Sequence, residues 1–199
     1  MTEEQKQENE EKGKQAEKLF SNYLNNKGIP FCHLDQKEEM KSIVFSDNDI
    51  QRPDFMMFIK NSIVYADVKY REKRQSADSE EKRFYLNKNE TARLTKFKNI
   101  FSADVWLPFT DNLDTEEFKF VHLSIISDFV EKLYVYIDKN CSKYDLNVFG
   151  ETWIQIPEKL LLDKLDFDKS FNKDLEPEFI KAEAKYHVKQ AYHLKGTQG

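Results

Sequence analysis

The stretch that decides the fold of this chain is Arg52–Lys69, RPDFMMFIKNSIVYADVK. It contains two β-prone runs, residues 55–59 and 62–66, separated by the polar pair Lys60-Asn61. Such runs on either side of a two-residue break predict a tight β-hairpin. The first run is apolar at every position, which predicts a strand covered on both of its faces.

The register of this hairpin brings two carboxylates together. A loop centred on the polar pair places Ile59 opposite Ser62. Stepping outward in the same register places Asp54 directly opposite Asp67. Directly opposed side chains have Cβ atoms about 5 Å apart, and like charges there are destabilising, so a bound cation would relieve the repulsion. Because side chains alternate along a strand, Lys69 projects from the same face as Asp67.

Length and composition favour one globular domain. The chain has 199 residues, of which 39% are hydrophobic and 34% charged. This is long enough for a sizeable core and predicts a heavily solvated surface. We expect a flexible or frayed N-terminal extension over residues 1–12, a single domain over 13–170, and a C-terminal helix or tail over 171–199.

The sequence also indicates a compartment. No apolar run approaches the roughly twenty residues that span a bilayer, and residues 1–18 are charged rather than built like a signal peptide. We therefore expect a cytoplasmic protein with no membrane partner. The two cysteines, Cys32 and Cys141, form no CxxC pair and are expected to be free, reduced thiols, which argues against a zinc or iron-sulfur cage.

Hydrophobic periodicity and capping residues predict the elements around the hairpin. Before and after the hairpin we expect a helix ending at Gly28, a strand at 42–45 and an exposed loop over 71–83. A helix from 87 or 89 to 101 follows, with Leu94, Phe97, Ile100 and Phe101 directed inward. The rest is expected to contain strands over 103–109 and 118–126, a helix capped by Ser127, a strand over 153–156, a short helix from Pro157 to Leu162 and a weakly amphipathic helix over 177–191. This order predicts an α/β fold with a small mixed central sheet flanked by helices on both faces.

The charge is segregated along the chain. The formal net charge is -5, yet Lys and Arg number 11 against 6 Asp and Glu in residues 60–100, whereas acids dominate before and after that segment. A phosphate backbone passing this segment would explain the bias, and the alternative is a merely solvated loop and helix. The candidates for nucleic-acid contact are Lys73, Arg74, Lys82, Arg83, Lys88, Arg93 and Lys96.

The two carboxylates suit a hard cation. Mg²⁺ keeps several waters and typically uses one or two protein carboxylates, a requirement that Asp54 and Asp67 meet. The carbonyl of Val68 is a candidate further ligand. Lys69 is placed to orient an attacking water and to stabilise negative charge. Such a site serves phosphodiester hydrolysis.

The spacing of these residues resembles the PD-(D/E)XK nuclease superfamily, which has the restriction-endonuclease-like fold. Pro53-Asp54, twelve intervening residues and then Asp67-Val68-Lys69 match its motif. In that family a preceding helix often carries a Glu that reaches the metal, and Glu17 is the matching residue here. The resemblance covers residues 13 to about 110.

The resemblance implies an endonuclease that uses Mg²⁺, with Mn²⁺ able to substitute, and that acts on DNA more than on RNA. Asp54, Asp67, Lys69 and Glu17 would form its active site. One departure is the position of a Gln that many relatives carry at the start of the helix after the Lys, since Gln75 lies in the polar loop instead.

Two alternatives remain open at this stage: a non-catalytic nucleic-acid-binding or assembly module of the same fold, and an RNA-directed nuclease. The sequence also leaves the oligomeric state open, a homodimer included.

Overall fold

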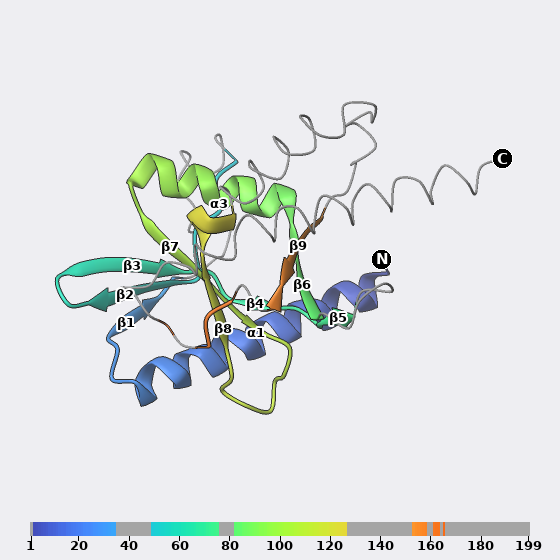
Figure 1. The fold of residues 1–199 in the computed structure, drawn as a ribbon. Helices are drawn as coiled ribbons and strands as arrows, with labels where there is room; N and C mark the ends of the chain where they lie inside the picture. Colours follow the sequence, from blue (N-terminus) through green and yellow to red (C-terminus); the bar gives the residue numbers. More distant parts are fainter. Residues whose placement is uncertain are drawn as a thin grey trace, which may run out of the picture.

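The computed structural model describes residues 2–34, 49–75, 82–126, 153–158, 161–163 and 165. Within them the chain forms two β-sheets and two long helices, and the helices lie on opposite sides of the larger sheet (Figure 1). The strand predicted at 42–45, the helix predicted at 177–191 and the C-terminal tail lie outside the described residues. None of the helices described is long and apolar enough to cross a membrane.

The first helix, α1, spans Glu3–Asn26. It begins with a capping box in which Thr2 and Gln5 satisfy each other's backbone N–H groups. Its buried stripe consists of Ala16, Phe20 and Leu24. The helix stops at Gly28, whose φ of 65° is the left-handed conformation that glycine adopts without strain. Residues 3–12, predicted as an extension, continue this helix.

The central sheet has six strands of mixed orientation. They are β1 (Phe31–His33), β2 (Phe55–Ile59), β3 (Ser62–Ala66), β4 (Lys69–Tyr70), β7 (Asp104–Thr110) and β8 (Lys119–His122). The pairs β1–β2, β2–β3 and β7–β8 are antiparallel, whereas β3 and β4 both pair with β7 in parallel. Strand β1 was not predicted.

The predicted hairpin register is confirmed. Ile59 pairs with Ser62 and Phe55 with Ala66, so Asp54 and Asp67 are the next residues outward on the two strands. The prediction that β2 is covered on both faces is wrong near the turn, where Phe58 is 41% exposed. Only one face of β2 is fully buried, because Phe55 and Met57 are buried whereas Met56, on the other face, is partly exposed.

Strands β3 and β4 are two halves of one strand. Val64 pairs with Asp104 and Lys69 with Phe109, so the register with β7 is the same on both sides of the interruption. The N–H of Asp67 still donates to the carbonyl of Trp106, at 3.0 Å. The next bond of a parallel ladder would come from residue 108, which is a proline and has no N–H. The ladder is therefore interrupted beside Asp67 and Val68.

A second sheet contains β5 (Arg74–Gln75), β6 (Lys82–Asn87) and β9 (Trp153–Pro157), all antiparallel. The prediction of an exposed loop over 71–83 is wrong at both ends, because β5 and the start of β6 pair there. Phe84 and Leu86 are fully buried, which is the alternation of a half-buried strand. Strand β6 leads into α3 (Lys88–Phe101) with no residue between them.

Each face of the central sheet has its own core. On one face, α1 packs against a cluster that includes Phe55, Trp106 and Phe120. On the other, α3 and the second sheet pack against a cluster that includes Val105 and Phe109. This confirms the predicted mixed α/β class, with a central mixed sheet covered by helices on both faces.

Helix α3 confirms one capping prediction and corrects one packing prediction. Asn87 caps the helix by accepting from the N–H groups of the second and third helical residues. Leu94 and Phe97 are buried as predicted, but Ile100 and Phe101 are 55% and 47% exposed. The helix turns out of the core there, because Ser102 ends it in the left-handed conformation.

Two boundaries near the end of the described chain also differ from the predictions. Strand β8 stops at His122, and residues 123–126 are helical, ahead of the predicted cap at Ser127. The N–H of Ser124 donates to Nδ1 of His122, which therefore caps this turn. Of the predicted helix from Pro157 to Leu162, the described residues show only a 3₁₀ turn: Pro157 ends β9, Glu158 is in 3₁₀ conformation and its carbonyl accepts from the N–H of Leu161 at 2.9 Å. Leu162 forms a bridge with Phe120.

Candidate functional site

Three charged side chains are buried together where β2 begins and β3 ends. Asp54 is 8% exposed, Asp67 is fully buried and Lys69 is 4% exposed. They are the three residues that the hairpin register brings together. Burying charged groups costs free energy unless each has partners, so the contacts of each side chain define what this cluster can do.

Asp54 is held by two backbone contacts. Its Oδ2 accepts from the N–H of Val68 at 2.7 Å, and its carbonyl accepts from the N–H of Leu34 at 2.7 Å. Burial raises the pKa of Asp54 well above its usual value, and the neighbouring carboxylate of Asp67 raises it further. Lys69 opposes this rise without cancelling it. The cluster therefore favours a proton, or another cation, on Asp54.

Asp67 has two polar partners. Its Oδ1 accepts from Nε2 of Gln51 at 3.2 Å, and its Oδ2 forms an ion pair with Nζ of Lys69. Burial raises the pKa of Asp67, with the attraction of Lys69 working in the opposite direction. The pKa values of Asp67 and Asp54 are thus both raised by burial, and Lys69 opposes the rise in each.

Lys69 is also paired with a carboxylate from the other side. Its Nζ lies 2.6 Å from Oε1 of Glu90, in the first turn of α3. Burial alone would lower the pKa of Lys69, but Asp67, Glu90 and Asp54 together raise it. Burial works to raise the pKa of Glu90, yet the charges of Lys69 and Arg71 lower it. Lys69 and Glu90 are therefore both charged at neutral pH.

Glu17 lies at the edge of this cluster. Its Oε2 is 2.9 Å from Nε2 of His33, whose ring packs on Phe55, the neighbour of Asp54. The charge of Glu17 contributes to the raised pKa of Asp54, which places it within electrostatic reach. Ala16 and Phe20, buried on either side in sequence, fix the orientation of this part of α1.

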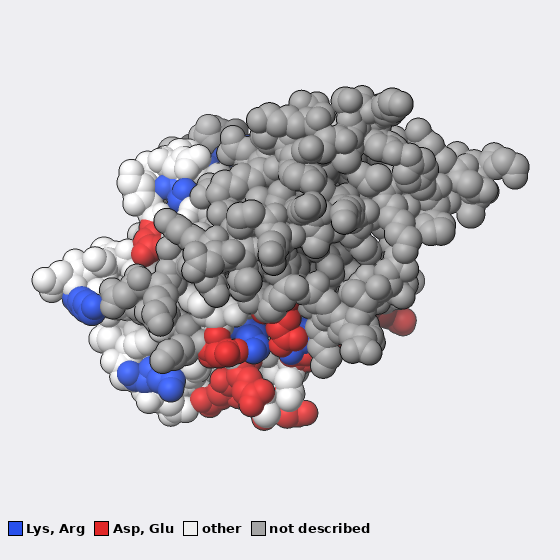
Figure 2. Space-filling model, in the orientation of Figure 1, with Lys and Arg blue, Asp and Glu red and all other residues white. Residues whose placement is uncertain are grey.

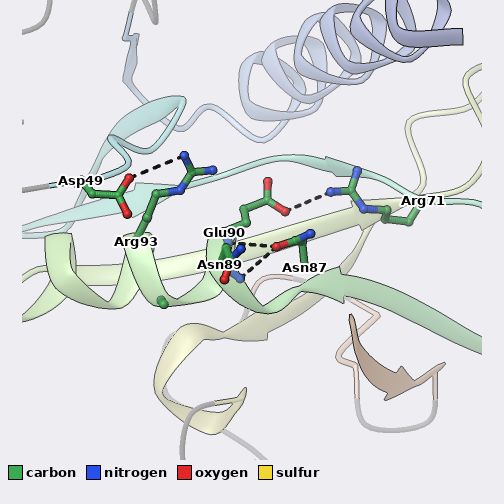
Figure 3. A pocket seen from close by; sticks show the side chains of 7 residues that line it. Asp49, Arg71, Asn87, Asn89, Glu90 and Arg93 are labelled. Atoms are coloured by element: carbon green, nitrogen blue, oxygen red, sulfur yellow. Dashed lines mark hydrogen bonds and ion pairs between the residues drawn. The ribbon is translucent and has the colours of Figure 1, made fainter. Parts of the chain in front are cut away.

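A cavity opens beside the cluster, on the α3 side. It has a volume of about 730 Å³ and is lined by Asp49, Arg71, Asn87, Asn89, Glu90, Ala92 and Arg93. Figure 3 shows that Glu90 faces Arg71 and that Arg93 faces Asp49 across this space. Because Glu90 also contacts Lys69, the cavity adjoins the buried charges.

The predicted nucleic-acid contacts fall into three groups. Arg74 and Arg83 are cross-strand partners and Lys82 pairs with Gln75, so these three lie on the second sheet. Lys73 is held by Asp111 at 3.2 Å and by Glu158 at 2.9 Å. Lys88, Arg93 and Lys96 lie on α3, and Arg93 and Lys96 are each 3.9 Å from Asp49. Among the predicted contacts whose side chains the structure describes, Arg93 and Lys96 are the most exposed.

Acidic and basic side chains are also interleaved on the surface. In Figure 2 they lie next to one another along the lower edge of the face shown.

Sequence reasoning missed three members of the cluster: Gln51, Arg71 and Glu90. Gln51 donates its amide to Asp67 from before the hairpin, whereas the family resemblance predicts a Gln after Lys69. The signal for Glu90 was present, since Asn87 and Glu90 have the spacing of an N-cap and the third helical residue. Gln75 lies in β5, in the second sheet.

The donor set fits a hard divalent cation. Asp54 and Asp67 are buried, adjacent and mutually repulsive, and Asp54 has a pKa raised by burial and by that repulsion. Carboxylate oxygens are the ligands that Mg²⁺ and Mn²⁺ prefer. In the part of the chain that the structure describes, no three His, Cys, Asp or Glu side chains are grouped closely enough to hold a metal by themselves. Cys32 is exposed and free, as predicted.

The comparisons with known proteins find a likeness among solved structures. No family model matches the chain, and no curated protein matches it. Hjc, a Holliday junction resolvase from the archaeal hyperthermophile Archaeoglobus fulgidus, has a similar structure, with a TM-score of 0.41 and 16% sequence identity over 57% of this chain and 79% of that chain. A likeness of this size carries no functional information by itself.

Proposed function

We propose that this protein is a divalent-cation-dependent nuclease that hydrolyses phosphodiester bonds, with DNA as its substrate. The observation that carries the proposal is the buried cluster of Asp54, Asp67 and Lys69 at the interrupted strand. Burying two facing carboxylates costs free energy, and buried charged groups of this kind are concentrated at functional sites.

The chain's own residues divide into ligands and a charge donor. Asp54 and Asp67 would hold Mg²⁺ or Mn²⁺. Glu17 would add a third carboxylate from α1 only after turning from His33, because the three carboxylates are not grouped in this structure. The carbonyl of Val68, whose N–H donates to Oδ2 of Asp54, would be a further ligand. When bound, the cation neutralises phosphate charge and acidifies a water.

Lys69 contributes by staying charged. Three carboxylates surround it, so its Nζ retains its protons at neutral pH. From that position it donates hydrogen bonds to the attacking water or to a phosphate oxygen, and it stabilises negative charge as that charge develops. Its burial keeps bulk water from weakening this interaction.

The substrate would approach from the α3 side. Lys88, Arg93 and Lys96 in α3 would contact the phosphate backbone, and such contacts fix position without reading sequence. The cavity lined by Arg71, Glu90 and Arg93 gives the backbone room beside the buried charges.

The test is cation-dependent cleavage by the full chain. Duplex, branched and single-stranded DNA and a single-stranded RNA are incubated with wild type, with Asp67→Asn and with Asp114→Asn, each in Mg²⁺, in Mn²⁺ and in chelator. Asp114 is exposed and remote from the cluster, so its substitution is a matched control. We expect cleavage by wild type and Asp114→Asn only when cation is present, and a loss of about 100-fold or more in Asp67→Asn.

Equal cleavage by wild type and Asp67→Asn would refute the assignment. Cation binding by the wild type without cleavage of any substrate would favour a non-catalytic module instead. Cleavage confined to RNA would retain the site and correct the substrate.

A further inference from the structure

Lys69 lies between two carboxylates that come from different parts of the fold. Asp67 is on the same strand, two residues earlier, and Glu90 is in the first turn of α3. Among these, Asp67 is a proposed cation ligand and Glu90 is not. Lys69 and a divalent cation therefore compete for Asp67, whereas Glu90 can pair with Lys69 whether or not the cation is bound.

The side chain of Glu90 is diverted from its ordinary local use. Glu90 is the third residue of α3, and a Glu at that position commonly reaches back to the backbone N–H of the cap residue. In α1 the equivalent residue, Gln5, does so. In α3 the cap residue Asn87 accepts from the N–H of Glu90, but the Glu90 carboxylate turns to Arg71, as Figure 3 shows. Its other oxygen contacts Lys69.

Arg71 fixes the second oxygen of Glu90. Its guanidinium donates to the carbonyl of Tyr85 at 3.1 Å, to the carbonyl of Tyr70 at 2.8 Å, and to Oε2 of Glu90 at 3.1 Å. Three acceptors from three segments hold this planar fork in one orientation. Arg71 is thus engaged within the protein and serves as a support for Glu90, whose Oε1 remains directed at Lys69.

We propose that Glu90 is a positioning residue, which retains the Lys69 ammonium beside the site when a divalent cation takes over Asp67. This inference rests on the proposed function. Without Glu90, Asp67 is the nearest carboxylate left to Lys69, so the lysine competes more strongly with the cation. With Glu90 in place, Lys69 releases Asp67 and keeps its charge within reach of the phosphate.

The decisive measurement is Mn²⁺ binding by calorimetry, in a cycle of four full-length proteins: wild type, Glu90→Gln, Lys69→Gln and the double variant. We expect Glu90→Gln to raise the Mn²⁺ Kd about tenfold in the wild-type background. In the Lys69→Gln background, where the competing ammonium is gone, the same substitution is expected to change the Kd by less than about threefold.

Activity gives the second readout. At saturating Mn²⁺, Glu90→Gln is expected to lower kcat about tenfold and to leave KM for DNA within about twofold. Glu72→Gln is the control, because it removes the same charge from a mostly exposed side chain, three residues after Lys69 in the sequence. It is expected to leave kcat unchanged. Melting curves of every variant establish that each is folded.

A shorter carboxylate keeps the test sharp if Glu90→Gln does not fold. Glu90→Asp retains the charge but withdraws its oxygens from Lys69 by one methylene. We expect it to raise the Mn²⁺ Kd at least about threefold. A Kd equal to that of wild type would overturn the positioning role.

The outcomes separate this inference from the function on which it rests. An equal rise of Kd in both lysine backgrounds would show that Glu90 acts by its own charge and would overturn the proposal. Absence of cleavage by wild type refutes the nuclease assignment, yet the four Kd values still decide the role of Glu90. Absence of Mn²⁺ binding by wild type overturns both.

Discussion

Replacing Asp54 by Asn is expected to stabilise the protein when no divalent cation is present. The amide is nearly isosteric with the carboxylate and keeps an oxygen that can accept from the N–H of Val68. It removes a buried charge that faces the charge of Asp67. The substitution thus removes a proposed cation ligand and, at the same time, removes electrostatic repulsion that destabilises the folded state.

The magnitude follows from three contributions. Opposed carboxylates about 5 Å apart repel by about 3 kcal/mol at an effective dielectric constant of about 20. Loss of the attraction between Asp54 and Lys69 offsets about 1 kcal/mol of this, and weakening of the charge-assisted bond from Val68 offsets about 1 kcal/mol more. The net gain is about 1 kcal/mol, which is about 2–4 °C in melting temperature for a chain of this size.

The gain depends on pH in a defined direction. The pKa of Asp54 in the folded protein is raised by burial and by Asp67 above the ordinary value of 3.8. The folded state therefore binds more protons than the unfolded state, and wild-type stability falls as pH rises from 3.8 through the folded pKa. The Asn variant does not lose stability in this way, because residue 54 no longer titrates. Its free energy of unfolding is expected to equal that of wild type in acid and to exceed it by the full amount above the folded pKa of Asp54.

The assay is thermal unfolding of wild type, Asp54→Asn and Asp114→Asn in chelator at pH 5 and pH 8, followed by titration with Mg²⁺. At 100 times its Kd, the cation should stabilise wild type by about 2.7 kcal/mol, and Asp54→Asn by much less. The reasoning fails if Asp54→Asn is no more stable than wild type at pH 8 in chelator. It fails equally if Mg²⁺ stabilises both proteins to the same extent.

Three further predictions concern lysines. Lys69→Gln should lower the cleavage rate about 100-fold at saturating Mn²⁺ without weakening Mn²⁺ binding, as measured by calorimetry; a weaker Kd with an unchanged rate would contradict this. Lys60→Gly should stabilise the hairpin by about 0.5–1 kcal/mol in denaturant unfolding, because Lys60 has a φ of 54° at a turn position that favours glycine; destabilisation would contradict it. Lys88→Gln combined with Lys96→Gln should weaken DNA binding and lower the slope of log binding constant against log salt concentration by about 2. Lys73→Gln should leave that slope unchanged, because Asp111 and Glu158 already pair with Lys73. A larger effect of Lys73→Gln than of the double variant would indicate that DNA binds on the Lys73 side instead of on α3.

The sequence predicted the hairpin and its facing carboxylates because the information for them is local. A two-residue turn and the alternation of side chains determine which residues of adjacent strands oppose each other, and Asp54 and Asp67 follow directly. The same reasoning placed the cap of α3 at Asn87.

The sequence did not predict the shell around Lys69 because that shell depends on distant segments. Glu90 reaches Lys69 only because α3 crosses the face of the sheet opposite to α1, and Gln51 reaches Asp67 from the segment that precedes β2. The strands within 71–83 were missed because charged residues mask the alternation of β6, where Phe84 and Leu86 point inward.

The direct junction between β6 and α3 links the second sheet to the chemistry of the first. Asn87 is at once the last residue of a strand and the cap of a helix, so no spacer absorbs a change of length between them. Deleting one residue from β6 would reverse the faces of the strand or rotate the helix by about 100°. Glu90 would then leave Lys69. Inserted or deleted residues are therefore not tolerated at this junction, and the three-stranded sheet determines how far α3 lies from the buried carboxylates.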